Sequence, residues 1–169
     1  DDITDGTSNT IAVGEIGSPI GTQVIGQFAI NQPTSMLSNP SLCLEVVGKQ
    51  RKYANGTTLS EVGRGGRWAD GAAGYSLFNT ILLPNSPSCA VGGREVVDGI
   101  YSAGSDHPGG AQFTMVDGSV RFIVETIDAG DSTAPPLTSK QLAAEHVPSP
   151  FGVWGALGSA NGEDVVGGY

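Results

Sequence analysis

The alternation of apolar and polar residues around Asp117-Gly118 constrains the fold of this chain more than any other feature. The stretch 111–124 reads AQFTMVDGSVRFIV. A period of two is typical of β-strands with one buried face, and Asp-Gly between two such runs is typical of a tight turn. We therefore predict an antiparallel hairpin with a two-residue loop, in which Met115 lies opposite Val120. In that register one face carries the side chains of Ala111, Phe113, Met115, Val120, Phe122 and Val124.

The residues that flank this hairpin raise the question of a catalytic or metal site. His107-Pro108-Gly109-Gly110 precedes the first strand, and nine residues separate the histidine from Asp117-Gly118. A strand rises about 3.3 Å per residue, so we expect His107 and Asp117 at opposite ends of one strand, too far apart to touch. Asp117 suits a turn, and the two glycines allow a bend into the strand. We expect the His107 imidazole to fix its loop by a hydrogen bond; a ligand or a general base is the alternative.

The remaining chain is rich in turn-forming residues, with 26 glycines and 10 prolines that follow no fixed period. This composition predicts many turns joining short strands. The fold class is mainly β (α+β): an antiparallel, sheet-rich head with one or two short helices, in a single domain over 1–169. Strands are predicted at 10–16, 23–30, 42–48 and within 94–104, a strand or a short helix within 72–86, a helix at 138–146, and an apolar turn around Trp154 and Leu157 that docks on the core.

The charge of the chain excludes one large class of function. The formal net charge is −9, with 8 Lys and Arg residues in total, so the basic footprint that nucleic-acid binding needs is missing. An acidic surface favours cations or basic partners, although it also serves ordinary solubility. No apolar run approaches the roughly 20 residues of a membrane span, and no signal peptide is visible. The sequence begins without Met, and we expect a processed form or a fragment.

The chain has two cysteines, Cys43 and Cys89, both in surroundings rich in Pro and Ser. Two Cys and two scattered His give few ligands for zinc. An even number of cysteines favours a disulfide in an exported protein, and two unpaired thiols are the alternative.

Four blocks of sequence carry a resemblance to a known family. They are ITDGTSNTIAVGE (3–15), RGGRWADG (64–71), HPGGAQFTMVDGSVRFI (107–123) and VWGALGSANGEDVVG (153–167). In this order they resemble the bacterial prepilin-like family of unknown function that has the His-x9-Asp-Gly motif. The blocks span nearly the whole chain, and together they are more specific than any one of them.

This resemblance implies a type IV pilin-like or type II secretion pseudopilin-like protein, exported to the cell envelope or beyond. Family members begin with a prepilin cleavage segment and a long hydrophobic helix, which a sheet-rich head follows. This chain resembles the C-terminal part of such a head, without the N-terminal helix. The segment PPLTSKQLAAEH (135–146) resembles an insertion, which suggests a lineage-specific contact surface.

Two groups of polar residues are candidates for a bound ion or an ion pair. Asp5, Ser8 and Asn9 lie in one Gly-containing loop, whose oxygens can wrap Ca²⁺ or cap their own backbone. Related pseudopilins often carry a calcium in a C-terminal loop, so the resemblance implies Ca²⁺ as a possible cofactor; none is required. Glu15 shares a strand face with apolar residues, and a buried carboxylate needs a partner, so we predict an ion pair with Arg64 or Arg67. Asp70 and Asp98 are expected in turns.

The sequence leaves three functions to weigh. Ser102, Ser105, Asp106 and His107 form the one polar cluster that suggests a hydrolase, but G-x-S-x-G, H-E-x-x-H and a phosphate-binding loop are absent. A calcium- or glycan-dependent binding module would use surface aromatics, with Trp68, Tyr75, Trp154 and Tyr169 as candidates, although both tryptophans suit the core. We favour a non-catalytic structural subunit that works through protein–protein assembly, with itself or with the N-terminal half.

Overall fold

The computed structural model describes residues 3–93, 98–138, 140–141 and 147–162 of the 169-residue chain. The strands are β1 (Ile11–Gly14), β2 (Cys89–Ala90), β3 (Gly99–Ile100), β4 (Gly110–Met115) and β5 (Val120–Val124). The helices are α1 (Ala73–Ser76) and α3 (Gly152–Leu157), together with the short 3-10 helices η1 (Thr34–Leu37), η2 (Pro40–Val46) and η3 (Lys49–Arg51). Small antiparallel sheets and few helices agree with the predicted β-rich α+β class.

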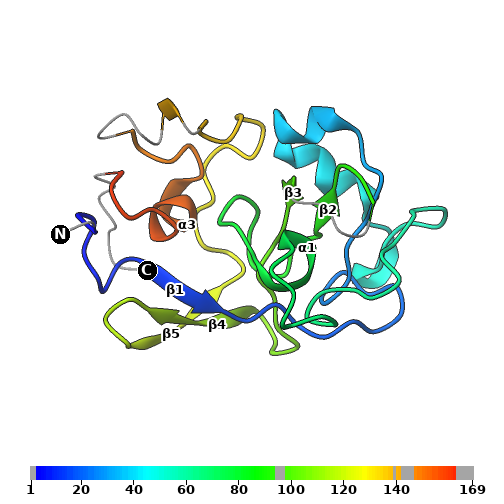
Figure 1. Cartoon of the computed structure of the whole chain (residues 1–169), viewed down its shortest axis with the longest axis horizontal. Coiled ribbons are helices and arrows are strands. Elements are labelled where there is room, and N and C mark those ends of the chain that lie inside the picture. The colour runs from blue at the N-terminus through cyan, green and yellow to red at the C-terminus, as the bar shows by residue number, and fades with distance from the viewer. Residues whose placement is uncertain (1–2, 94–97, 139, 142–146, 163–169) are drawn as a thin grey trace.

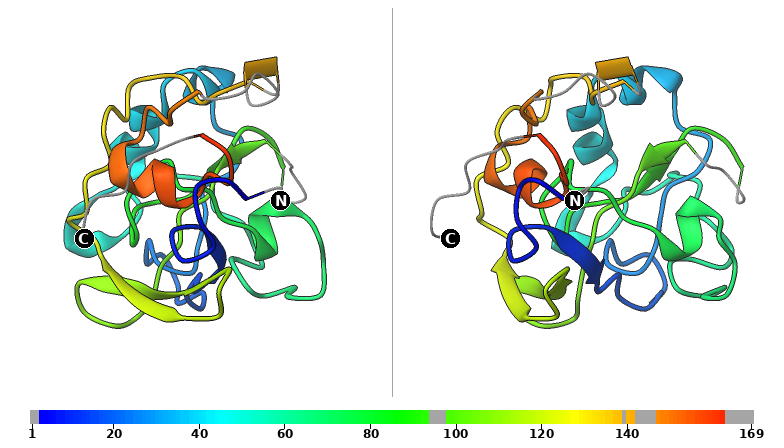
Figure 2. Two further views of the ribbon diagram at one scale, coloured as in Figure 1. Left: turned by 90° about the vertical axis from the view of Figure 1, so that its left-hand side faces the viewer. Right: turned by 60° about the vertical axis from the view of Figure 1, so that its left-hand side comes forward.

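Two sheets occupy different halves of the molecule (Figure 1). The larger has the order β1-β4-β5, all antiparallel, and lies with α3 in one half. The smaller pairs β2 with β3 in the other half, near α1 and the 3-10 helices. The β4–β5 hairpin lies at the rim of the molecule in every ribbon view (Figure 2).

The core follows this division. Behind the larger sheet, Ala111, Phe113, Met115 and Ile123 pack with Trp154 and Leu157 of α3, so the apolar segment around Trp154 does dock on the core. A second cluster surrounds the two cysteines and Tyr53, and a third surrounds Phe28, Tyr75 and Tyr101. Edge-to-face rings connect the members of the third cluster, with Phe28 placed about 6 Å from both tyrosines.

The predicted hairpin is present, but its register differs by one residue. Thr114 pairs with Val120, and the Met115 N–H donates to the Ser119 carbonyl at 2.8 Å. The loop therefore has three residues and ends in Gly118, whose φ is +84°, as in a type I turn followed by a bulge. A shift of one residue exchanges the faces of a strand. Ile123 is consequently buried at 1% exposure, whereas Val120, Phe122 and Val124 are 61, 48 and 46% exposed.

Three other predictions of local structure had mixed outcomes. The strand at 10–16 is confirmed as β1. The prediction of a strand at 42–48 is wrong, because this segment lies mostly in η2: Pro40 stands at its first turn, and Leu42, Cys43, Val46 and Val47 have the helical spacing that turns them toward one cluster. The stretch 23–30 forms isolated bridges rather than a strand, because Gly26 interrupts it with a φ of +75°.

The other elements lie partly outside the described residues. β3 confirms a short strand within 94–104, although 94–97 lie outside the described part. The segment 72–86 contains a short helix, α1. For the helix predicted at 138–146, Thr138 and Gln141 exchange hydrogen bonds as in a helix N-cap, and 139 and 142–146 lie outside the described residues. No helix in the described residues is long and apolar enough to cross a membrane.

Candidate functional site

The loop that leads into β4 positions His107 at the rim of a shallow hollow. The hollow has a volume of about 540 Å³ and is lined by residues 14–18 and 105–107, so that Glu15, Asp106 and His107 share its wall. Asp106 and His107 are exposed. The His107 backbone N–H donates to the Ser105 hydroxyl at 3.3 Å. The loop is thus fixed by the backbone of His107, where we had expected the imidazole to fix it.

Asn85 holds this loop against the hairpin, a role that the sequence did not predict. Its Oδ1 accepts from the Ser105 N–H at 2.9 Å, and its Nδ2 donates to Glu125 at 2.9 Å and to the Gly110 carbonyl at 3.4 Å. One amide side chain therefore connects the His107 loop to the start of β4 and the end of β5. The sequence feature that could have indicated this role is the position of Asn85 between two prolines in PNSP. Asn tolerates the left-handed backbone region, and the φ of Asn85 is +67°.

Asp117 fixes the turn at the other end of β4. Its Oδ1 accepts from the Ser119 N–H at 2.8 Å and from the Ser119 hydroxyl at 2.7 Å. These hydrogen bonds, with a smaller contribution from the charge of Arg121, hold the pKa of the Asp117 carboxyl below its usual value. The six residues of β4 separate Asp117 from the His107 loop, which corresponds to about 20 Å. The two residues thus brace opposite ends of one strand.

Glu15 contacts the hairpin through a backbone amide. Its carboxylate accepts from the Gln112 N–H at 2.7 Å. Arg67 pairs instead with Asp70, at 3.9 Å, and Arg64 donates to the carbonyl of Leu77. The predicted ion pair of Glu15 with an arginine is therefore replaced by a different partner for each group. The strand face on which the sequence placed Glu15 is not a buried one, since Val13 on the same predicted face is 63% exposed.

Arg64 is buried at 1% exposure and lies over the ring of Tyr101, with 5.2 Å between Cζ and the ring centroid. Burial lowers the pKa of the Arg64 guanidinium to about 10, an effect that nearby Tyr101 and Tyr53 partly oppose. Nε and Nη1 have no hydrogen-bond acceptor within the part of the chain that the structure describes. A cation–π contact and one carbonyl thus hold the guanidinium, which serves the packing between two clusters.

The N-terminal loop uses its polar side chains on its own backbone and on the C-terminal segment. Asn9 donates from Nδ2 to the Asp5 carbonyl at 3.3 Å, and the Asp5 carboxylate accepts from the Gly162 N–H at 2.9 Å. The loop also accepts from the hairpin, because the Asp117 N–H donates to the Thr7 carbonyl at 3.0 Å. Asp5, Ser8 and Asn9 remain a possible calcium loop by prediction. In the described residues, no three His, Cys, Asp or Glu side chains are grouped to hold a metal.

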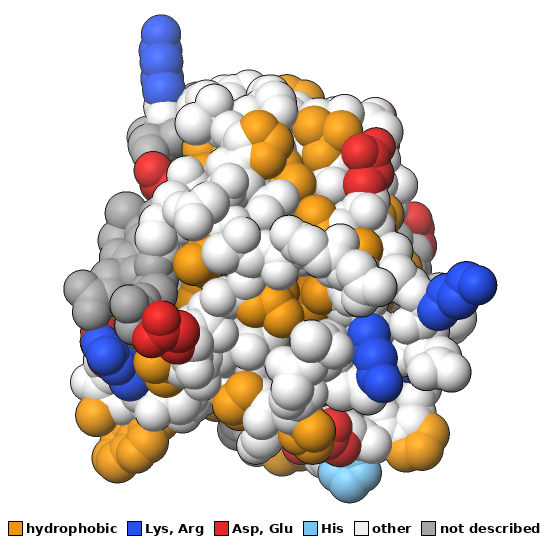
Figure 3. Space-filling view, turned by 90° about the vertical axis from the view of Figure 1, so that its right-hand side faces the viewer, with side chains coloured by type: hydrophobic (Ala, Val, Ile, Leu, Met, Phe, Trp, Pro, Cys, Tyr) orange, Lys and Arg blue, Asp and Glu red, His pale blue; other side chains and the backbone are white. Residues whose placement is uncertain are grey.

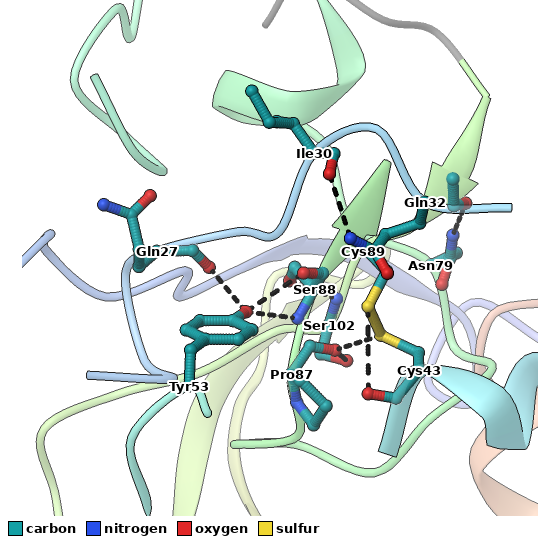
Figure 4. The surroundings of a disulfide bond; sticks show 11 residues. Gln27, Ile30, Gln32, Cys43, Tyr53, Asn79, Pro87, Ser88, Cys89 and Ser102 are labelled. Atoms are coloured by element: carbon teal, nitrogen blue, oxygen red, sulfur yellow. Dashed lines mark hydrogen bonds between the residues drawn. A yellow bond between two sulfur atoms is a disulfide. The ribbon is translucent and has the colours of Figure 1, made fainter. Parts of the chain in front are cut away.

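Cys43 and Cys89 form a disulfide that joins η2 to β2 (Figure 4), as predicted. Beside it, the Tyr53 hydroxyl bonds to the carbonyls of Gln27 and Ser88 and accepts from the Ser88 N–H. Burial raises the pKa of the Tyr53 phenol, and the hydrogen bonds and Arg64 oppose that shift in part. This buried network makes a rigid centre for the half of the molecule that contains the smaller sheet.

The serines of the suspected catalytic cluster have structural partners. Ser102 is 4% exposed, and its hydroxyl donates to the Pro87 carbonyl at 3.0 Å, beside the disulfide. Ser105 is 5% exposed, and its hydroxyl accepts from the His107 backbone. Asp106 and His107 are exposed in the loop. Ser102 therefore does not line the hollow, and Ser105, which does, is buried and hydrogen-bonded to the backbone of the loop.

The aromatic candidates for a binding platform differ in exposure to solvent. Tyr75 and Trp154 are fully buried, while Trp68 is 83% exposed, so the expectation that both tryptophans are core residues is wrong for Trp68. Tyr169 lies outside the described residues. On the face drawn in Figure 3, the hydrophobic side chains form separate groups between uncharged surface. The described aromatics thus do not gather into one exposed platform.

A protein-family model matches most of the chain. The family described as "Protein of unknown function (DUF1559)" matches residues 1–130, which is more than half of the chain. The chain belongs to this family. No curated protein and no solved structure matches the chain.

The DUF1559 match contains the whole larger sheet and both braced ends of β4. It ends before the segment 135–146, which resembles an insertion, and before α3. Trp154 of α3 nevertheless packs on the matched part, because its indole N–H donates to the Leu82 carbonyl at 2.8 Å. The residues beyond the DUF1559 match thus complete the core of the half that contains the larger sheet.

Within the DUF1559 region, all four acidic residues of the first three blocks accept a backbone N–H. Asp5 accepts from Gly162, Glu15 from Gln112, Asp70 from Ala72 and Asp117 from Ser119, at 2.7–3.0 Å. A carboxylate in such a hydrogen bond stays ionised and fixes the local backbone. Chemically, this arrangement braces loops. The hollow beside His107 differs from it, because two exposed titratable groups, Asp106 and His107, share its wall.

Proposed function

We propose that this chain is a non-catalytic structural subunit of an extracellular or envelope-associated, pilin-like or pseudopilin-like assembly. The observation that carries the proposal is the use of the four acidic residues in the first three resemblance blocks. Each of them is hydrogen-bonded to a backbone N–H, which is the role of a brace and not of a general acid or base. The blocks are thus typical of a sequence that specifies a fold.

The disulfide and the resemblance support the location in this proposal. A disulfide buried in the core is typical of proteins that fold in an oxidising compartment, such as the periplasm or the cell exterior, and both sulfur-bearing residues are at most 1% exposed. A pilin-like head would fold in that compartment. The His-x9-Asp-Gly motif then acts as the frame of one hairpin, with His107 at the entry and Asp117 at the turn.

The test is a measurement of assembly and of chemistry on the same purified protein. We expect the mass in solution, followed by light scattering or sedimentation from micromolar concentration upward, to rise through self-association. We expect panels of ester, glycoside and peptide substrates to give no turnover above that of a His107→Ala variant. Turnover that disappears in His107→Ala would overturn the structural proposal.

The hollow beside His107 favours a hydrolase as the second candidate. It places Glu15, Asp106 and His107 on one open wall, and two acids with an imidazole can serve acid–base chemistry. Against this candidate, the Glu15 carboxylate is occupied by the Gln112 N–H, and the Ser102 and Ser105 hydroxyls are buried. A Glu15→Gln variant separates the two: it keeps an acceptor for the Gln112 N–H, and it would abolish activity if Glu15 were an acid or a base.

A further inference from the structure

Within the described residues, the outer strand of the larger sheet has backbone groups without a hydrogen-bond partner. Among the described residues β5 pairs with β4 alone. The odd-numbered residues turn their backbone toward β4, because the Ser119 carbonyl accepts from Met115 and the Glu125 N–H donates to the Gly109 carbonyl. Since alternate residues of a strand bond to opposite sides, the backbone groups of Val120, Phe122 and Val124 point outward from the sheet edge. The Val124 carbonyl is the exception in part, since it accepts from the Ile127 N–H at 3.2 Å.

The same three residues expose apolar side chains. Val120, Phe122 and Val124 are 61, 48 and 46% exposed, whereas Ile123 between them is buried. The Phe122 ring lies against Gly110, where an added Cβ would come within 2.9 Å of it, so the ring covers the first residue of β4. The apolar surface continues to β1, because Val13, which is 63% exposed, lies in the row of Thr114 and Val120.

A strand edge of this kind usually carries a protective device. Lysines, prolines and bulges on edge strands prevent pairing with other chains. The outward row of β5 is Val-Phe-Val and has none of them. An apolar side-chain row together with free backbone groups is the form of edge that takes up a further strand.

We propose that β5 pairs antiparallel with β5 of a second copy of this chain, about a two-fold axis at Phe122. In this register Phe122 lies opposite itself, and Val120 lies opposite Val124 of the copy. The outward N–H and carbonyl groups then meet their counterparts, except that the Val124 carbonyl also accepts from Ile127, and β-branched and aromatic side chains meet across the strands. The two three-stranded sheets join into one. This inference rests on the proposed function, since it assigns the surface through which the subunit assembles.

The distribution of charge favours a second copy as the occupant. The whole chain has a net charge of −9, so two copies repel over most of their surface. The β5 edge avoids this repulsion. Glu125, the acid at the end of the strand, pairs with Arg51 at 3.0 Å and accepts from Asn85. Arg121, the one charged residue within the strand, interacts electrostatically with Asp117. A strongly basic partner, by contrast, would find no acidic surface along β5.

The size of the contact sets the strength that we expect. Five paired residues extend about 17 Å, and such an edge buries less than the roughly 800 Å² per partner of a standard stable interface. A single β5–β5 contact should thus be weak and dependent on concentration. In an assembly, repeated contacts raise the effective strength without any new surface.

Cysteine cross-linking tests the register directly. Opposite residues of an antiparallel pair lie about 4.5–5.5 Å apart between Cα atoms, which a disulfide can span. We expect Phe122→Cys to give a disulfide-linked dimer under mild oxidation. Val120→Cys is the matched control. In this register residue 120 of the second copy lies four residues away along the strand, so this variant should not form the disulfide-linked dimer. The double variant Val120→Cys/Val124→Cys should cross-link. The native cysteines do not interfere, because both are in the buried disulfide.

A second measurement makes the result independent of oxidation. Phe122→Lys should reduce self-association at least tenfold in concentration, while Trp68→Lys, at an exposed aromatic outside the strands, should leave it unchanged. Equal cross-linking of Phe122→Cys and Val120→Cys would overturn the inference, as would a wild-type chain that stays monomeric. Self-association that survives Phe122→Lys would also overturn the inference. It would still support the proposed structural function, because the subunits would then assemble through a surface other than β5.

Discussion

Phe113 and Trp154 pack edge to face, with 5.3 Å between their ring centroids and 66° between the ring planes. The contact joins β4 of the larger sheet to α3. On its other side Trp154 donates its indole N–H to the Leu82 carbonyl at 2.8 Å. One fully buried side chain therefore connects the hairpin, the segment around Leu82 and the C-terminal helix.

This position predicts that Trp154→Phe destabilises the protein even though the new ring stays apolar. The Leu82 carbonyl loses its donor, and a buried polar group without a partner costs about 1–3 kcal/mol; the smaller ring adds a cavity. The free energy of unfolding in urea measures the loss. Trp68→Phe, at an 83% exposed position, should change that free energy by less than about 0.5 kcal/mol. Equal losses in the two variants would contradict this assignment.

The register of the hairpin predicts a large and a small loss of stability at two adjacent residues. Ile123→Ala removes a buried side chain from the core and should cost about 2–5 kcal/mol. Val124→Ala changes a residue that is 46% exposed and should cost less than about 1 kcal/mol. Unfolding at low protein concentration avoids any contribution from association. A larger loss for Val124→Ala than for Ile123→Ala would contradict this register and support the two-residue loop.

The sequence predicted where the hairpin lies, but not which residues of β5 face the core. Asp117-Gly118 fits the two-residue turn, and it fits equally a three-residue loop that begins at Val116 and ends at Gly118. β4 alternates, but β5 ends in three consecutive apolar residues, Phe122, Ile123 and Val124, so the pattern alone does not distinguish the two registers. Packing decides between them: Ile123, and not Phe122, fits beside Trp154 and the other core residues of α3.

The candidate site was predictable where a residue acts on its neighbours in the chain. Asp117 could be recognised as a turn residue because its side-chain hydrogen bonds are to Ser119, two residues away. The partners of Glu15 and Asn85 lie 97 and 40 residues away, at Gln112 and Glu125. Such pairings depend on how the segments pack, and no local pattern contains them.

The disulfide predicts a large loss of stability on its removal. Cys43 and Cys89 are separated by 46 residues, and in the chain-entropy model a loop of this length contributes about 4 kcal/mol. Cys43→Ala/Cys89→Ala should lower the free energy of unfolding by about this amount. Adding reductant should lower the wild type toward the variant and leave the variant unchanged. A wild type that is indifferent to full reduction would contradict the prediction.

Gly26 predicts a severe effect of a single added methyl group. Its φ is +75°, and a Cβ there would lie 2.0 Å from the Ser18 carbonyl oxygen, so the backbone itself must move. Gly26→Ala should prevent stable folding or cost several kcal/mol. Gly21→Ala is the matched control, because Gly21 also has a positive φ, +55°, but meets nothing within 4 Å. It should cost only about 1–2 kcal/mol, the strain of the left-handed region. Circular dichroism with thermal unfolding compares the two.

Glu125 predicts a specific part of the dependence of stability on pH. Hydrogen bonds from Asn85 and Arg51, in that order, hold the pKa of its carboxyl below the usual value. The folded state therefore binds the proton less tightly than the unfolded state, whose pKa is about 4.3. The stabilising contribution is complete above that value and is lost as the pH falls through the lower pKa of the folded state.

We expect the wild type to lose more stability than Glu125→Gln between about pH 5 and pH 2. The difference should stay below about 1 kcal/mol, because the side chain is 31% exposed and solvent screens its pair with Arg51. The pKa values of Asp117 and Asp131 are also lowered, by hydrogen bonds from Ser119 and Thr133. Both carboxyls remain in each variant, so the difference between the two profiles isolates Glu125.

Urea unfolding at each pH gives the profiles. Arg51→Gln should remove a smaller part of the difference, since the bond from Asn85 remains, and identical profiles for the wild type and Glu125→Gln would show that the carboxylate contributes nothing.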